Sequence, residues 1–174
     1  MFRDKCPVYI FIKSKPVNYG TKVGVAAVAK NFYSYNVEVY TGKTDGAREK
    51  KQEIRVDKGM VCHMYGNGRS VTADTFFTSR ELANLLLTRN VTLVGKLRKN
   101  EAEIPALFLS GKQKQVYSSI FGFSNDLTLV SYVPARNKTV ILLSSQHHDD
   151  TCMGAEKDHK PEIILQNNVT KNGF

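Results

Sequence analysis

At 174 residues, with 41% hydrophobic side chains, the chain is long enough for one domain with an apolar core. It has no apolar run that could span a bilayer, and its N-terminus lacks the apolar segment of a secretory signal, which argues against a membrane or secreted protein. The 25 basic and 16 acidic residues give a net charge of +9, which favours a polyanionic partner, nucleic acid before a membrane surface. Cys6, Cys62 and Cys152 are few and widely spaced, which indicates reduced intracellular thiols.

The first part of the chain has three β-prone segments. Val8–Ile12 is a compact run of β-branched and aromatic residues, and Thr21–Ala29 follows a Lys-Pro turn. Ser34–Tyr40 alternates apolar and polar residues, which is typical of a half-buried strand. Because short turns join the three, we predict an antiparallel meander, followed by a polar surface loop over Gly42–Lys51.

The middle part alternates helical and β patterns. Thr78 and Glu81 have the spacing of a capping box, and the leucines that follow give one apolar helical face that ends near Asn90. The predicted elements in order are a helix over Ile54–Met64, a strand over Ser70–Ala73, a helix from Thr78 to Asn90 and a strand over Val91–Leu97.

The last part returns to a β pattern separated by turn residues. We predict strands over Gln115–Phe123, Leu127–Val133 and Thr139–Ser144. The segment His147–Lys160 is polar and predicts a mobile loop, and Glu162–Gln166 is a short strand-like run.

The most informative stretch is Arg69–Glu81. A short strand delivers Asp74 to its carboxyl end, and Phe76, Phe77 and a helix start follow at once. Chemistry in open α/β sheets gathers beyond the carboxyl ends of strands, so Asp74 is a candidate catalytic acid and metal ligand. The alternative is an Asp whose side chain only bonds backbone amides in a strand-to-helix turn.

Basic residues at turns and strand ends are candidate phosphate contacts. Such contacts would give salt-sensitive, sequence-independent binding to DNA, and Phe76 could offer a stacking face. The alternatives are ordinary solvated charges and an aromatic side chain that anchors the helix behind it. The candidate nucleic-acid-binding residues are Lys15, Lys22, Lys96, Arg98 and Lys99.

Several motifs, in order and at compatible spacing, resemble piggyBac-type transposases and the domesticated proteins derived from them. Asp74-Thr75-Phe76-Phe77-Thr78-Ser79 is similar to the family's Asp-Asn-aromatic-Phe-Thr-Ser motif, with Thr75 in place of Asn. The other similar segments are Phe2–Pro7, Ser14–Lys22, Val39–Lys43, Val94–Asn100 with Ile104–Pro105, and Leu129–Tyr132 with Leu142–Ser145.

The resemblance implies an α/β fold of the ribonuclease-H-like type. Three antiparallel strands would be followed by strand–helix units, which agrees with the local patterns above. Residues 1–104 would form a partial core, residues 105–146 a β-rich insertion, and residues 147–174 a polar tail that leads toward a third acidic motif.

The resemblance also implies an activity. Family transposases cut and join DNA with three Asp residues that hold divalent ions, Mg²⁺ or Mn²⁺, and Asp74 is the one match here. The first acid would precede Phe2, and the third would follow Thr170–Phe174. Since one carboxylate cannot fix two ions, we expect no stable metal binding and no DNA cleavage by the chain alone.

The sequence therefore predicts a nuclear, DNA-binding remnant of a transposase catalytic domain, which could dimerise with a related transposase. The alternatives are a domesticated, non-catalytic nuclear protein that binds DNA or protein, and a fragment without a role of its own.

Overall fold

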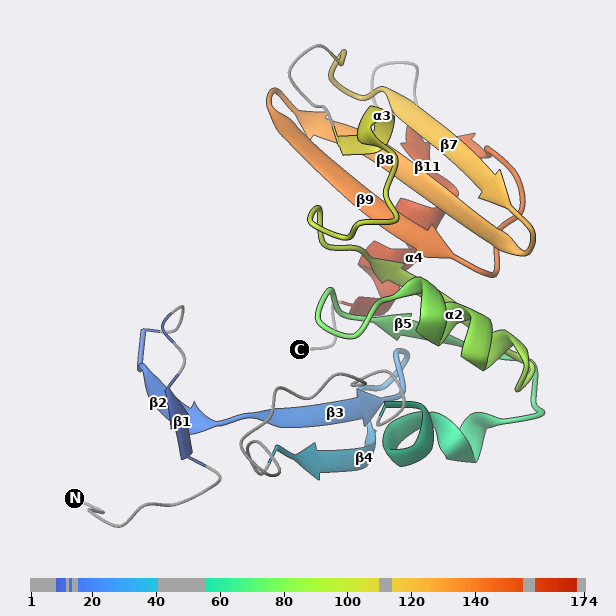
Figure 1. The fold of residues 1–174 in the computed structure, drawn as a ribbon. Coiled ribbons are helices and arrows are strands. Elements are labelled where there is room, and N and C mark those ends of the chain that lie inside the picture. The colour runs from blue at the N-terminus through green and yellow to red at the C-terminus, as the bar shows by residue number, and fades with distance from the viewer. Residues whose placement is uncertain are drawn as a thin grey trace.

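A five-stranded mixed sheet forms the upper part of the molecule in Figure 1, and its strand order is β5-β6-β9-β8-β7. Strands β5 and β6 are parallel, and every other neighbouring pair in this sheet is antiparallel. The strands are β5 (Arg69–Ala73), β6 (Val91–Lys96), β7 (Ser119–Ser124), β8 (Leu127–Ala135) and β9 (Lys138–Ser144). The computed structural model describes residues 9–11, 13, 16–40, 56–109, 114–154 and 159–171.

Helices cover both faces of this sheet because its inner strands are apolar on both sides. Strand β6 is a nearly continuous apolar run, as expected for a strand buried on two faces. Leu93 contributes to a cluster on one face, with α2 (Arg80–Leu87) and α3 (Ala106–Leu109). Val94 contributes to a second cluster, with Ile163 and Ile164 of α4.

Helix α4 (Glu162–Lys171) corrects the strand predicted over Glu162–Gln166. The Ile163-Ile164 pair favours a strand locally, but with Asn167 these residues lie at helical spacing and are all buried. Packing against the sheet therefore overrides local propensity. Ten residues make α4 the longest described helix, and none of the helices in the described ranges combines the length and hydrophobicity that a bilayer crossing requires.

Two small hairpins precede the sheet, and Figure 1 shows them below and beside it. Antiparallel pairing was predicted here and is confirmed, but the described residues form four strands in two separate pairs instead of a three-stranded meander. Within each pair a short connection joins the two strands, which keeps the entropy cost of closing the loop low. The strands are β1 (Tyr9–Phe11) with β2 (Tyr19–Thr21) and β3 (Val23–Ala27) with β4 (Ser34–Val39).

The predicted middle helix is present from Val56 to Met64 as an irregular, non-α segment. A π-helical turn, η2 (Val56–Val61), runs into a single 3₁₀ turn, η3 (Cys62–Met64). Tyr35 of β4 donates its hydroxyl to the Met60 carbonyl at 3.1 Å, which ties the second hairpin to this turn. The predicted loop over Gly42–Lys51 lies outside the described residues.

The start of α2 differs from the predicted capping box by one residue. Ser79 is the N-cap, and its hydroxyl accepts a hydrogen bond from Leu82 N at 3.0 Å. Thr78 is buried, and its hydroxyl donates to the Asp74 carbonyl at 3.0 Å. The helix itself is confirmed, and Asn90 follows it with a left-handed φ of 58°.

The polar pattern after β9 predicts a mobile loop, but the described residues of this segment make specific contacts. His147 is half-buried, and Ser144 Oγ lies 2.8 Å from its Nδ1. A short pair, β10 (Cys152–Met153) with β11 (Lys160–Pro161), then leads into α4. Cys62 and Cys152, the cysteines within the described ranges, are free thiols. The predicted division of the chain into a core, an insertion and a tail at residues 104 and 146 stays a prediction. The five-stranded sheet includes strands from both sides of residue 104, because β9 pairs with β6.

Candidate nucleic-acid interface

The parallel strands β5 and β6 end at the same edge of the sheet. Ala73 pairs with Gly95, so the next residues, Asp74 directly after β5 and Lys96 at the end of β6, lie side by side at this edge. Both residues are exposed to solvent. A carboxylate and an ammonium group are thus presented together, as sequence reasoning expects for the carboxyl ends of neighbouring parallel strands.

The turn after β5 uses the backbone of Asp74 and leaves its side chain available. Its carbonyl oxygen accepts hydrogen bonds from Phe77 N at 2.9 Å and from Thr78 N at 3.1 Å. Within the described residues, the Asp74 carboxylate accepts no hydrogen bond. The turn interpretation of the Asp74 side chain is therefore not what the geometry shows, and the carboxylate is open to a ligand.

A close approach fixes this turn on β6. Thr78 lies directly over Gly95, so that a Cβ added to Gly95 would overlap the Thr78 hydroxyl and lie 3.0 Å from the Ala73 carbonyl oxygen. Glycine is required here because no larger residue leaves room for the buried threonine. The position of Asp74 thus depends on the contact between Thr78 and Gly95.

Phe76 lies between two cations. Lys22 Nζ is 3.1 Å from the ring centroid, and Arg98 Cζ is 5.2 Å from it. Arg98 also donates from Nη2 to the Phe76 carbonyl at 3.3 Å. Cation–π attraction to Phe76 brings Lys22, which lies between β2 and β3, to the edge that carries Asp74, and the hydrogen bond holds Arg98 at Phe76.

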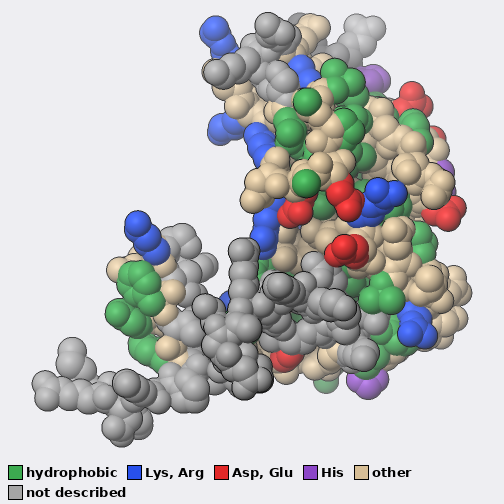
Figure 2. Space-filling view, viewed as in Figure 1, with side chains coloured by type: hydrophobic (Ala, Val, Ile, Leu, Met, Phe, Trp, Pro, Cys, Tyr) green, Lys and Arg blue, Asp and Glu red, His purple; other side chains and the backbone are tan. Residues whose placement is uncertain are grey.

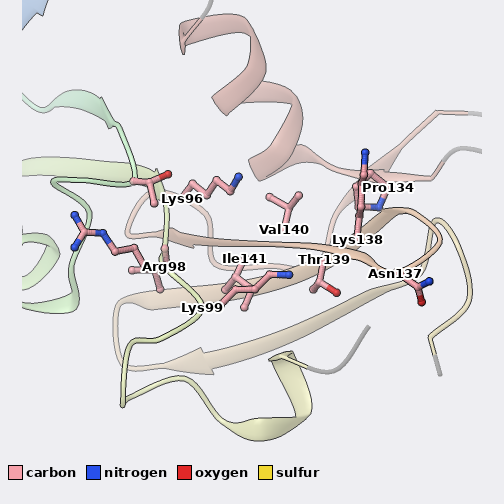
Figure 3. A pocket seen from close by; sticks show the side chains of 11 residues that line it. Lys96, Arg98, Lys99, Pro134, Asn137, Lys138, Thr139, Val140 and Ile141 are labelled. Atoms are coloured by element: carbon pink, nitrogen blue, oxygen red, sulfur yellow. The ribbon is translucent and has the colours of Figure 1, made fainter. Parts of the chain in front are cut away.

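A cleft of about 430 Å³ opens beside this edge (Figure 3). Its described lining includes Lys96, Arg98, Lys99 and Lys138 and no acidic residue, and we call it the basic cleft. Figure 3 shows Lys96 and Lys138 on either side of Val140, while Arg98 points the other way. Lys96, Lys99 and Lys138 around this cleft, with Arg98 beside it, create a positive field that suits a phosphate backbone.

Comparison with known proteins identifies the family. The family profile described as "Transposase IS4" matches residues 1–172. A piggyBac transposase, solved by cryo-EM as a synaptic complex with hairpin DNA, is similar over 99% of this chain with 34% identity and a TM-score of 0.86. The chain belongs to the piggyBac-type transposase family. It spans 36% of the length of that transposase.

The family assignment confirms the resemblance read from the sequence motifs. The structure is a mixed α/β fold with a five-stranded sheet, matching a transposase fold. Its ribonuclease-H-like arrangement stays a prediction.

The fold of this chain brings together most of the residues that the sequence predicts for DNA contact. Lys96, Arg98 and Lys99 line the basic cleft, Lys22 reaches the same edge through Phe76, and Lys15 lies outside the described residues. Sequence reasoning missed Lys138, which joins the cleft because β9 is the neighbour of β6. The one local signal was the basic hairpin turn Arg136-Asn137-Lys138.

The described residues do not by themselves fit a pair of divalent ions. They contain no group of three His, Cys, Asp or Glu side chains placed to hold a metal. Asp74 offers one hard oxygen ligand, and the cations of the basic cleft beside it would repel a second positive ion. Binding of Mg²⁺ or Mn²⁺ at Asp74 stays a prediction for a complete transposase, and no catalytic step is assigned to this set of residues.

Proposed function

We propose that this transposase domain holds DNA by its phosphates in the basic cleft, next to Asp74. The observation that carries the proposal is that Lys96 at the end of β6, Arg98 and Lys99 in the segment after it, and Lys138 at the start of β9 line one cleft. The similar piggyBac transposase was solved with DNA, which supports the same class of ligand. Contacts of this kind position a duplex without reading its bases.

The domain would serve as the DNA-holding part of a metal-dependent strand-cleavage and strand-transfer enzyme. Asp74 would supply one of the acidic ligands of that enzyme, and this set of residues would not cleave DNA on its own, because one carboxylate cannot fix a two-ion site. Work on chromosomal DNA implies a nuclear location, and dimerisation with a related transposase would bring two DNA ends together.

Salt dependence of DNA binding tests the cleft. In a fluorescence-anisotropy titration with a short duplex of arbitrary sequence, the logarithm of the association constant should fall linearly with the logarithm of salt concentration. The double variant Lys99→Gln/Lys138→Gln should reduce the steepness of that line by about 2, since each lost phosphate contact removes roughly 0.9.

The matched control is Lys30→Gln/Lys171→Gln, which removes the same charge from exposed positions away from the cleft. It should keep nearly the wild-type slope. If both variants lose the same slope and affinity, the +9 charge acts diffusely, and the cleft is not the binding site.

A cleavage assay tests the second half of the proposal. Supercoiled plasmid incubated with the 174-residue chain and Mg²⁺ or Mn²⁺ should stay intact while the same preparation binds DNA. Turnover that disappears in Asp74→Ala would contradict the proposed need for further acidic ligands.

A further inference from the structure

A second and larger concavity opens on the other side of Arg98. It has a volume of about 1120 Å³ and is bounded by the start of α2, the segment between β6 and α3, and the β7–β8 hairpin; we call it the acidic groove. Its floor is apolar and comes from the sheet and its connections. The floor residues are Leu97, Ile104, Phe108, Leu127, Leu129 and Leu143.

The groove exists because one face of the sheet is incompletely covered. Helix α4 packs over β6 and β9 on the opposite face. On the groove side, α2 packs on β6 at one end and the four-residue α3 packs on β8 and β9 at the other. Within the described residues no helix lies between them, so the floor of the groove is formed by core side chains of the sheet: Leu97, Leu127 and Leu143 are almost fully buried, and Leu129 is partly exposed.

The rim of the groove is acidic in a strongly basic protein. Glu81, Glu101 and Glu103 line it, and Glu103 forms an ion pair with Arg80 at 3.7 Å. The other cation of the lining, Arg98, donates to the Phe76 carbonyl. Figure 2 shows acidic side chains gathered over the middle of this face and basic side chains along its edge. Glu81 and Glu101 therefore give this rim a local negative charge in a protein whose net charge is +9.

We propose that the acidic groove binds an amphipathic segment of a partner protein, whose apolar side chains enter the groove against Phe123 and Leu129 and whose Lys or Arg side chains face Glu81 and Glu101. An acidic rim repels phosphate, so the groove is distinct in ligand from the basic cleft. An apolar concavity with a charged rim is the form in which an amphipathic helix is received. Phe123, 55% exposed on the rim, offers an aromatic anchor of the kind that dominates binding energy.

Two synthetic peptides of identical leucine pattern test the proposal, one carrying Lys and one Glu at the remaining positions. In anisotropy titrations with the full 174-residue chain, the Leu/Lys peptide should bind at least tenfold more tightly than the Leu/Glu peptide. The overall charge of +9 favours the opposite order, so this preference reports on the groove. Equal binding, or a preference for the Leu/Glu peptide, would overturn the proposal.

Variants locate the binding. Glu81→Lys/Glu101→Lys should reverse the preference between the two peptides. Phe123→Ser should lower the affinity for the Leu/Lys peptide by tenfold or more. The matched control is Phe32→Ser, at a similarly exposed phenylalanine (50%) outside the groove, which should leave binding unchanged. Circular dichroism shows that each variant is folded before it is compared.

Two further readouts separate other occupants. Light scattering should show that the chain alone is monomeric. If the chain self-associates and Phe123→Ser abolishes that association, a second copy occupies the groove and the proposal is wrong. A short DNA duplex should leave the peptide bound. Displacement of the peptide by DNA, sensitive to the Glu81→Lys/Glu101→Lys change, would assign the groove to nucleic acid and overturn the proposal equally.

Discussion

Phe76 contributes to this edge of the sheet through its ring and its backbone together. The ring attracts Lys22 and Arg98, and the carbonyl accepts from Arg98. The two interactions hold the Arg98 guanidinium at Phe76, so a flexible side chain behaves as a positioned charge. Sequence reasoning named Phe76 as either a stacking face or a core anchor, and the structure gives it a third role as a holder of cations.

A double-mutant cycle measures this role. Phe76→Leu and Arg98→Gln should show a coupling free energy of roughly 0.5–1 kcal/mol in urea unfolding, the usual range for an exposed cation–π pair. The control cycle pairs Phe76→Leu with Lys99→Gln and should show coupling near zero. Equal coupling in both cycles would mean that the effect is long-range electrostatics.

His147 predicts a pH dependence of stability. Burial lowers the pKa of His147 below its ordinary value of 6.5, partly opposed by the nearby Glu162 and Asp149 carboxylates and reinforced by His148. The Ser144 hydroxyl accepts from Gln146 N and His147 N, so it donates to Nδ1 and requires a neutral ring. As pH falls below 6.5 the unfolded chain binds the proton first, and the stability present above that pH is lost.

The free energy of unfolding, measured by urea denaturation, should therefore decrease between pH 7.5 and pH 5.5. His147→Asn keeps a hydrogen-bond acceptor without a titrating ring and should flatten this decrease, whereas His148→Gln at an exposed position should largely preserve it. An unchanged pH profile in His147→Asn would assign the dependence to other groups.

The turn between β5 and α2 places Asp74 through steric contact. Gly95→Ala should lower the free energy of unfolding by about 1–3 kcal/mol, the range for overpacking, because the new methyl overlaps the buried Thr78. Gly20→Ala is the matched control, since a Cβ at that strand position meets nothing within 4 Å. Chemical denaturation with both variants checks the difference, and an equal effect would show that the loss comes from strand propensity alone.

Elements with a strong local pattern were predictable from the sequence, and elements defined by distant partners were not. The strand before Asp74, the leucine-faced helix and the apolar strand β6 each carry a clear local pattern, and the structure confirms them. Helix α4 was missed because its Ile163-Ile164 pair has β propensity and its buried face is set by the sheet. Lys138 was missed for a related reason, since nothing local indicates that β9 inserts beside β6.

At the scale of the whole molecule, the central sheet and the first hairpins should differ in stability. Val94, Val130 and Leu142 in the sheet are almost fully buried, whereas Tyr9 and Tyr19 of the β1–β2 pair are each 56% exposed. An isolated two-stranded hairpin is marginal in water. Hydrogen exchange followed by mass spectrometry should show much slower exchange in β6, β8 and β9 than in β1 and β2. Comparable protection in both would contradict the burial pattern.

The insertion of β9 between β6 and β8 has a consequence for the newly made polypeptide. Leu93 of β6 donates its amide to the Ser145 hydroxyl, 52 residues later in the chain. A ribosome adds roughly 5–20 residues per second, so β6 waits several seconds for its neighbour to emerge. Throughout that interval an apolar strand exposes unpaired amides and carbonyls, which are open to pairing with any other nascent chain. Expression at low temperature or with chaperones should raise the yield of this polypeptide more than any change in its surface.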